Sequence, residues 1–206
     1  MTEMRMGQRL LLVLLATLAR LSPSHAFEVE EGQCQRILSG EARVRIHYAS
    51  GHQSEVDPVD RDNVNLQVEV FPDGRWVSHT WIGGMLPLET RWGRVIYADK
   101  EATRLRLEEG ETRTFPFTYE LLSGGTTSGT LVVAVEQVHK AAFGECQATF
   151  VTLQITRSWS GHAQPAKIRR VFVKSLGFFI ASIVEQVKDG KPQLDTSRPT
   201  RIELIR

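Results

Sequence analysis

Apolar and polar side chains alternate along much of this chain with a period of two residues. From Val64 to Val70 every second residue is Val or Leu, and the residues between them are Asn, Gln and Glu. The segment from Arg43 to Tyr48 alternates in the same way. This period places one face of a strand on a core and the other in water, as in antiparallel sheets. Pro72-Asp73-Gly74 comes next and predicts a hairpin turn, because Pro fixes φ and Gly accepts a left-handed backbone.

Alternating segments recur to the end of the chain, separated by turns that contain Gly or Pro. We therefore expect an all-β protein, built as a single antiparallel β-barrel or sandwich of roughly ten strands. The segment from Phe178 to Val187 is ambiguous, because Phe179, Ile183 and Val187 are also four residues apart, as on a helix. Its β-branched residues favour a strand, with a short C-terminal helix as the alternative.

The N-terminus has the pattern of an export signal. Arg5 and Arg9 precede an apolar run from Leu10 to Ala19, and Ser24-His25-Ala26 offers small residues where signal peptidase reads. The run is about half of the roughly 20 apolar residues that span a bilayer, so an uncleaved anchor is the less favoured alternative. We predict a signal peptide over residues 1–26, cleaved after Ala26, and a single β-rich domain over residues 27–206. The mature chain is then periplasmic or secreted and has no transmembrane segment.

Two cysteines, Cys34 and Cys146, remain after this cleavage. In an oxidising compartment two remaining cysteines usually pair, so we predict a disulfide between them. A catalytic thiol is the alternative, but the sequence has no C-x-x-C motif.

The chain shows no recognisable catalytic or metal-binding motif. Its 25 basic and 24 acidic side chains nearly balance, which argues against a nucleic-acid partner. No histidine pair has metal-ligand spacing, and the acidic cluster over 57–63 lacks the residue order of a calcium loop. No serine lies in a G-x-S-x-G elbow. We therefore predict no catalytic residue, no metal site and no cofactor, and expect a protein that is not an enzyme.

The C-terminal third resembles a pattern found in exported, β-rich bacterial proteins that are grouped as domains of unknown function. The matching pieces are Glu136-Gln137-Val138, Ala142-Phe143-Gly144, Phe150 to Trp159, Val171-Phe172-Val173 and Leu176-Gly177-Phe178. The sequence departs from the pattern at Lys174-Ser175, where a Tyr-Ser-Pro-like segment is expected, and at Cys146. The resemblance implies an exported β-fold and carries over no catalytic residue.

Aromatic residues gather around the Gly83-Gly84 break. Trp76, His79, Trp81 and Trp92 are the candidate ligand-binding residues, because tryptophans beside a flexible turn can line an apolar or sugar pocket. The alternative is that they fill the core.

Export, a β-pattern and clustered aromatics together suggest a non-catalytic binding or scaffolding module. The expected partner is an apolar or cell-envelope small molecule, or an envelope protein. Two other functions stay open at this point. One is an envelope hydrolase that uses carboxylate or histidine residues, and the other is a structural interaction domain without a ligand pocket.

Overall fold

The structure is a computed structural model that describes residues 27–57, 64–98, 106–160, 165–188 and 191–205. The predicted signal peptide, with its cleavage residue Ala26, lies outside the described residues. The first elements are β1 (Glu28–Val29), α2 (Cys34–Leu38), β2 (Val44–Tyr48), β3 (Gln53–Val56), β4 (Val64–Val70), β5 (Trp76–Ile82), β6 (Leu86–Thr90) and β7 (Gly93–Tyr97). They are followed by β8 (Thr112–Leu121), β9 (Thr126–Phe143), β10 (Cys146–Trp159), β11 (Ala166–Val173), β12 (Phe178–Lys188), β13 (Lys191–Ser197) and β14 (Pro199–Leu204).

All of these strands belong to one sheet, which confirms the all-β prediction. From β2 to β13 every strand pairs antiparallel with the next strand in the sequence. The last strand, β14, returns to pair with β2, and β1 adds a short parallel pairing to β14. Short loops therefore suffice for most of the topology, as in a β-meander.

The predicted barrel or sandwich of roughly ten strands is wrong in its finer detail. The sheet has fourteen strands in the order β1-β14-β2 through β13, and it is neither split into two sheets nor closed into a barrel. Only Arg198 separates β13 from β14, so the chain passes there from the β12 edge to the neighbourhood of β2. Across the described residues no ladder joins the two edges, β1 and β13, and this is why the barrel stays open.

The ambiguous segment near the C-terminus is the strand β12, as the pattern favoured, and not a helix. It pairs with β11 on one side and with β13 on the other, and these two ladders satisfy its backbone groups. A short helix lies instead near the N-terminus, where α2 buries Cys34 and Ile37. That helix is one and a half turns long, too short to leave a periodic signal in the sequence.

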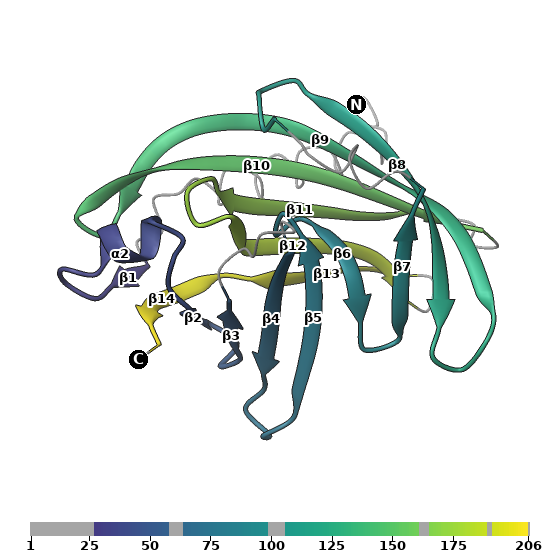
Figure 1. Cartoon of the computed structure of the whole chain (residues 1–206), viewed down its shortest axis with the longest axis horizontal. Helices are drawn as coiled ribbons and strands as arrows, with labels where there is room; N and C mark the ends of the chain where they lie inside the picture. The colour runs from purple at the N-terminus through teal and green to yellow at the C-terminus, as the bar shows by residue number, and fades with distance from the viewer. Residues whose placement is uncertain (1–26, 58–63, 99–105, 161–164, 189–190, 206) are drawn as a thin grey trace, which may run out of the picture.

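Strong curvature of the sheet creates its core. Figure 1 shows β4 to β7 crossing in front of β11, β12 and β13, so that one face of the sheet turns inward upon itself. Gly84, in the β5–β6 turn, lies so close to the β11–β12 turn that an added Cβ would come within 2.0 Å of the Gly177 carbonyl oxygen. The sequence needs glycine there for a second reason, because Gly84 has a φ of +66°. The Gly83-Gly84 break is thus a close contact between distant parts of the sheet.

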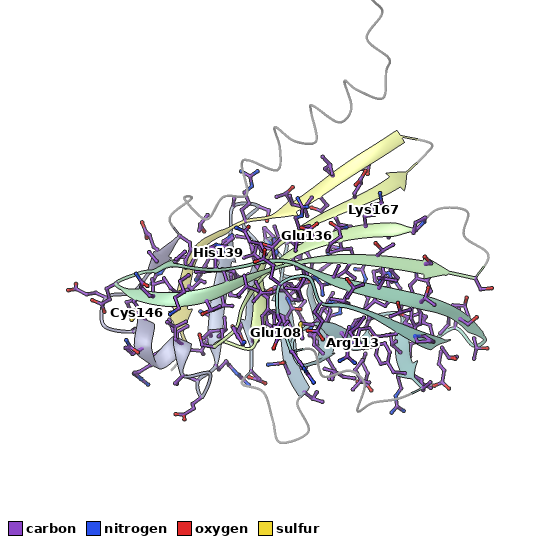
Figure 2. All side chains as sticks on the ribbon, turned by 90° about the horizontal axis from the view of Figure 1, so that it is seen from above. Glu108, Arg113, Glu136, His139, Cys146 and Lys167 are labelled. Carbon is purple, nitrogen blue, oxygen red and sulfur yellow. A yellow bond between two sulfur atoms is a disulfide. The ribbon has the colours of Figure 1, made fainter. Side chains whose placement is uncertain are left out.

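The N-terminal segment is fastened to the far end of the longest hairpin. A disulfide joins Cys34 in α2 to Cys146 at the start of β10, as the cysteine count predicts. Figure 2 shows Cys146 at the tip of the β9–β10 hairpin. The Gly32 amide donates to Glu145 Oε1 over 2.8 Å, and the Phe27 ring packs edge-on against Phe143. These contacts cover the end of the hairpin.

Candidate functional site

The face of β4 that points into the protein is polar. Polar and apolar residues alternate along this strand, so its outer face is the apolar one. Asn65 and Gln67 are 0 % and 1 % exposed, whereas Leu66 between them is 40 % exposed. The alternation therefore predicts the strand correctly, but the buried face of this strand is the polar one and not the apolar one. The register with β5 explains the reversal, since Asn65 and Gln67 stand opposite the inward-facing Trp81 and His79. Residues directly opposite in an antiparallel pair share a face.

Gln67 is at the centre of a buried hydrogen-bond network. Its amide nitrogen donates to Ser54 Oγ over 2.8 Å, and its amide oxygen accepts from Trp81 Nε1 over 2.9 Å. Neither Ser54 nor Gln67 is exposed by more than 1 %. A buried amide is tolerated only when its donors and acceptors are paired, and here β3 and β5 supply the partners.

Glu69 continues the polar row toward the end of β4. Its carboxylate lies 3.5 Å from His79 Nε2 on β5. Burial alone raises the pKa of Glu69, but the hydrogen bond and charge of His79 outweigh it, and the pKa lies below its usual value. Glu69 is therefore ionised at neutral pH. The other ring nitrogen of His79 is buried and has no hydrogen-bond partner.

Arg170 reaches the same interior from the opposite wall of the sheet. Its guanidinium carbon lies 4.1 Å from the centre of the Phe179 ring and 4.5 Å from that of Trp81. One terminal nitrogen donates to the Met85 carbonyl oxygen over 3.1 Å, while Nε is buried and unpaired. Burial, followed by repulsion from Arg157, lowers the pKa of Arg170 to about 9. Even so, the side chain is protonated at neutral pH.

Arg157 is a second half-buried cation, on the neighbouring strand β10. Its guanidinium carbon lies 5.0 Å from the centre of the Trp159 ring, and its Nε is also buried and unpaired. Trp159 in turn packs edge-on against Phe117 and Tyr119, with ring centres 5.0 and 5.3 Å away. Burial lowers the pKa of Arg157. Within the described part of the chain, neither Arg157 nor Arg170 forms a salt bridge with a carboxylate.

Two tyrosines complete the polar part of this interior. Burial raises the pKa of Tyr48 on β2 and of Tyr97 on β7, so both hydroxyls keep their protons. The Tyr97 hydroxyl donates to the Pro87 carbonyl oxygen over 3.0 Å. We refer to Gln67, Glu69, His79, Trp81, Tyr48, Tyr97, Arg157 and Arg170 as the inner polar cluster.

The structure separates the four predicted ligand-binding residues into two groups. His79 and Trp81 belong to the inner polar cluster, with ring centres 6.1 Å apart. Trp76 and Trp92 are 68 % and 57 % exposed and lie at turns, outside the core. The glycine break does not bring all the tryptophans together, because successive residues of a strand point to opposite faces.

The two half-buried arginines, Arg157 and Arg170, are the functional candidates that the sequence analysis missed. The sequence did contain an indication of them. Each arginine occupies one of the alternate positions of its strand that otherwise hold apolar residues, and the residues two positions before and after it are apolar. Arg157 stands between Ile155 and Trp159, and Arg170 stands between Ile168 and Phe172. In this chain, a charged residue at an inward-facing position of a strand indicates a candidate binding site better than an aromatic residue near a turn does.

Other kinds of site were sought among the described residues. None of them form a group of three or more His, Cys, Asp or Glu side chains that could hold a metal ion. Their only helix is too short and too polar to be a candidate for crossing a membrane.

Comparisons with known proteins identify no family. No protein-family model matches the chain, and neither does any curated protein. The structure is similar, with a TM-score of 0.45, to the crystal structure of the hypothetical lipoprotein YmcC from Escherichia coli (K12). The two are 10 % identical, and the match covers 96 % of this chain and 96 % of that chain.

Proposed function

We propose that this protein is a non-catalytic binding protein of the cell envelope, which holds an amphipathic molecule with an anionic group against the inner face of its sheet. The observation that carries the proposal is a pair of half-buried arginines, Arg157 and Arg170, each of which has a buried, unpaired Nε and no salt bridge to a carboxylate of the described chain. A buried cation is unfavourable unless it is paired, and arginine cannot neutralise itself at physiological pH. An anionic ligand would provide the missing partner through charge-assisted hydrogen bonds.

The surroundings of Arg170 favour a bound ligand over a purely structural role. Its guanidinium is strongly desolvated, yet the residue keeps part of its surface accessible. Among the described residues it makes one hydrogen bond, which uses a single N–H of the five that guanidinium offers. Trp81 and Phe179 supply apolar surface beside these free donors. This combination of apolar walls and a few polar groups is typical of sites for small amphipathic molecules.

Export supports a role in the envelope. The predicted signal peptide over residues 1–26 directs the chain out of the cytoplasm, and the Cys34–Cys146 disulfide is typical of an oxidising compartment. Mass spectrometry of the exported protein tests this point directly, since cleavage after Ala26 leaves a chain that begins at Phe27.

Native mass spectrometry is the first test of ligand binding. Protein isolated from the periplasm without detergent is expected to carry an adduct, and extraction should show that the adduct contains a carboxylate, phosphate or sulfate group. A clean mass at that of the mature chain, together with no binding of an anionic fluorescent fatty-acid probe, would contradict the proposal.

Matched arginine variants identify the site. Arg170→Met removes the inward cation, whereas Arg169→Met removes its neighbour, which forms a salt bridge of 2.8 Å with Glu136. We expect Arg170→Met to weaken probe binding by about tenfold or more, because a charge-assisted hydrogen bond contributes about 1.5–3 kcal/mol. Arg169→Met should bind normally. Reproducible turnover of an ester, glycoside or peptide, abolished by one polar substitution, would favour the envelope hydrolase instead.

A further inference from the structure

Exposed apolar side chains gather at one end of the sheet. Of the seven large apolar residues that are exposed in the described chain, four lie at three turns. These four are Trp76 (68 % exposed), Trp92 (57 %), Leu121 (38 %) and Leu122 (79 %). The turns join β4 to β5, β6 to β7 and β8 to β9, and alternate turns of a meander fall at the same end of the sheet. Figure 1 shows the three turns along its lower rim.

The strand register places Trp76 and the β6–β7 turn on the same side of the last pairing that β5 and β6 share, which joins Thr80 to Glu89. Trp76 pairs with Val70 at the base of the β4–β5 turn. Arg91 and Trp92 form the β6–β7 turn between the paired residues Thr90 and Gly93. The β8–β9 tip is held beside Trp92, because the Leu122 amide donates to the Trp92 carbonyl oxygen over 2.9 Å.

Arginines accompany the apolar side chains at two of the tips. The Arg91 guanidinium carbon lies 4.0 Å from the centre of the Trp92 ring, and that of Arg75 lies 5.6 Å from the Phe71 ring. Arg91 forms no salt bridge with a described carboxylate. Tryptophan and arginine are the side chains that suit the boundary of a membrane, where a ring meets the acyl chains and a cation meets lipid phosphates.

The shape of this rim favours a lipid surface over a protein partner. A specific protein interface needs a continuous, closely packed area. The rim instead offers separate projecting tips, and polar residues such as Asp73 and Ser123 stand between the apolar ones. A fluid bilayer surface accommodates such tips one by one, since each side chain inserts at its own depth.

We propose that the tips of the β4–β5, β6–β7 and β8–β9 turns dock this protein onto the surface of a lipid bilayer. Trp76, Trp92 and Leu122 enter the boundary between headgroups and acyl chains, and Arg91 contacts lipid phosphate. We call these four residues the rim anchor. The rim anchor acts independently of the inner polar cluster, so each proposal stands or fails alone.

Vesicle binding tests the rim anchor. The exported form of the protein is mixed with vesicles of phosphatidylcholine, with and without phosphatidylglycerol, and bound protein is measured by sedimentation. Lipids brominated along the acyl chain should quench tryptophan emission if the rings insert. We expect the wild type to bind, and Trp76→Ser, Trp92→Ser and Leu122→Ser combined to reduce binding at least about tenfold. Arg91→Gln should reduce binding most on the vesicles that contain phosphatidylglycerol, because the choline group of phosphatidylcholine offsets the charge of its phosphate.

Leu194→Ser is the matched control. Leu194 is 60 % exposed but lies within β13, away from the three turns, so its replacement should leave vesicle binding unchanged. Circular dichroism confirms that each variant folds. The proposal is overturned if the wild type does not bind vesicles, or if the triple variant binds as well as the wild type. It is also overturned if ultracentrifugation shows that the same residues join two copies of the chain in solution.

Discussion

Reduction of the Cys34–Cys146 disulfide is the perturbation with the best-defined magnitude. The bond joins residues separated by 112 positions, so in the unfolded chain it closes a very long loop. The loss of chain entropy on closing a loop of that length corresponds to about 5 kcal/mol at 25 °C. We therefore expect reduction to lower the free energy of unfolding by that amount. Cys34 is 1 % exposed, so a reductant will act mainly when the N-terminal segment detaches.

Urea unfolding followed by tryptophan fluorescence is the assay. With an m-value of about 2 kcal/mol/M, the loss would move the midpoint to lower urea by about 2.5 M. Thiol counting on the denatured protein must show no free thiol before reduction and two afterwards. A midpoint that does not move after verified reduction would refute the chain-entropy reasoning. Two free thiols in the exported, unreduced protein would refute the bond itself.

Three further predictions concern the turns of the sheet and the polar inner face of β4. Gly84→Ala should destabilise the protein by about 3 kcal/mol or more in urea unfolding, because its Cβ would clash with the Gly177 carbonyl; Gly74→Ala, with a φ of +82° and no neighbour within 4 Å, should cost about 1–2 kcal/mol. Gln67→Leu should cost about 2–4 kcal/mol in the same assay, because it leaves a buried indole N–H without an acceptor. Glu69→Gln should flatten the acid limb of the stability profile. The pKa of Glu69 in the folded protein lies below the ordinary glutamate value of 4.5. Its contribution to stability is therefore present above about pH 4.5 and is lost as the pH falls through the lower folded-state pKa. An unchanged acid limb would contradict this assignment.

The candidate site shows where sequence reasoning reached its limit. His79 and Trp81 could be named from the sequence, because aromatic residues near a glycine break attract attention as possible pocket residues. The contribution of Arg170 depends on Trp81 and Met85, which lie on distant segments and meet it only when the sheet curls. No local pattern encodes such a meeting.

The sequence of β4 does not show which of its two faces is buried, for a related reason. The period of two in β4 is encoded locally by residues that alternate in polarity, and it predicts a strand whichever face is buried. The choice of the buried face depends on partners across the sheet. Gln67 faces inward because Ser54 and Trp81 can satisfy its amide there.

The sequence by itself determined that the chain is a β-protein and that its two cysteines pair, and it favoured a strand over a helix for residues 178–187. The first two follow from local periodicity and from a count, and neither requires knowledge of distant neighbours. Only the tertiary structure decided that fourteen strands form one open, curled sheet, that the polar face of β4 turns inward, and that Arg157 and Arg170 share its interior. Those outcomes depend on the curvature of the whole sheet, which brings together residues from strands far apart in its order.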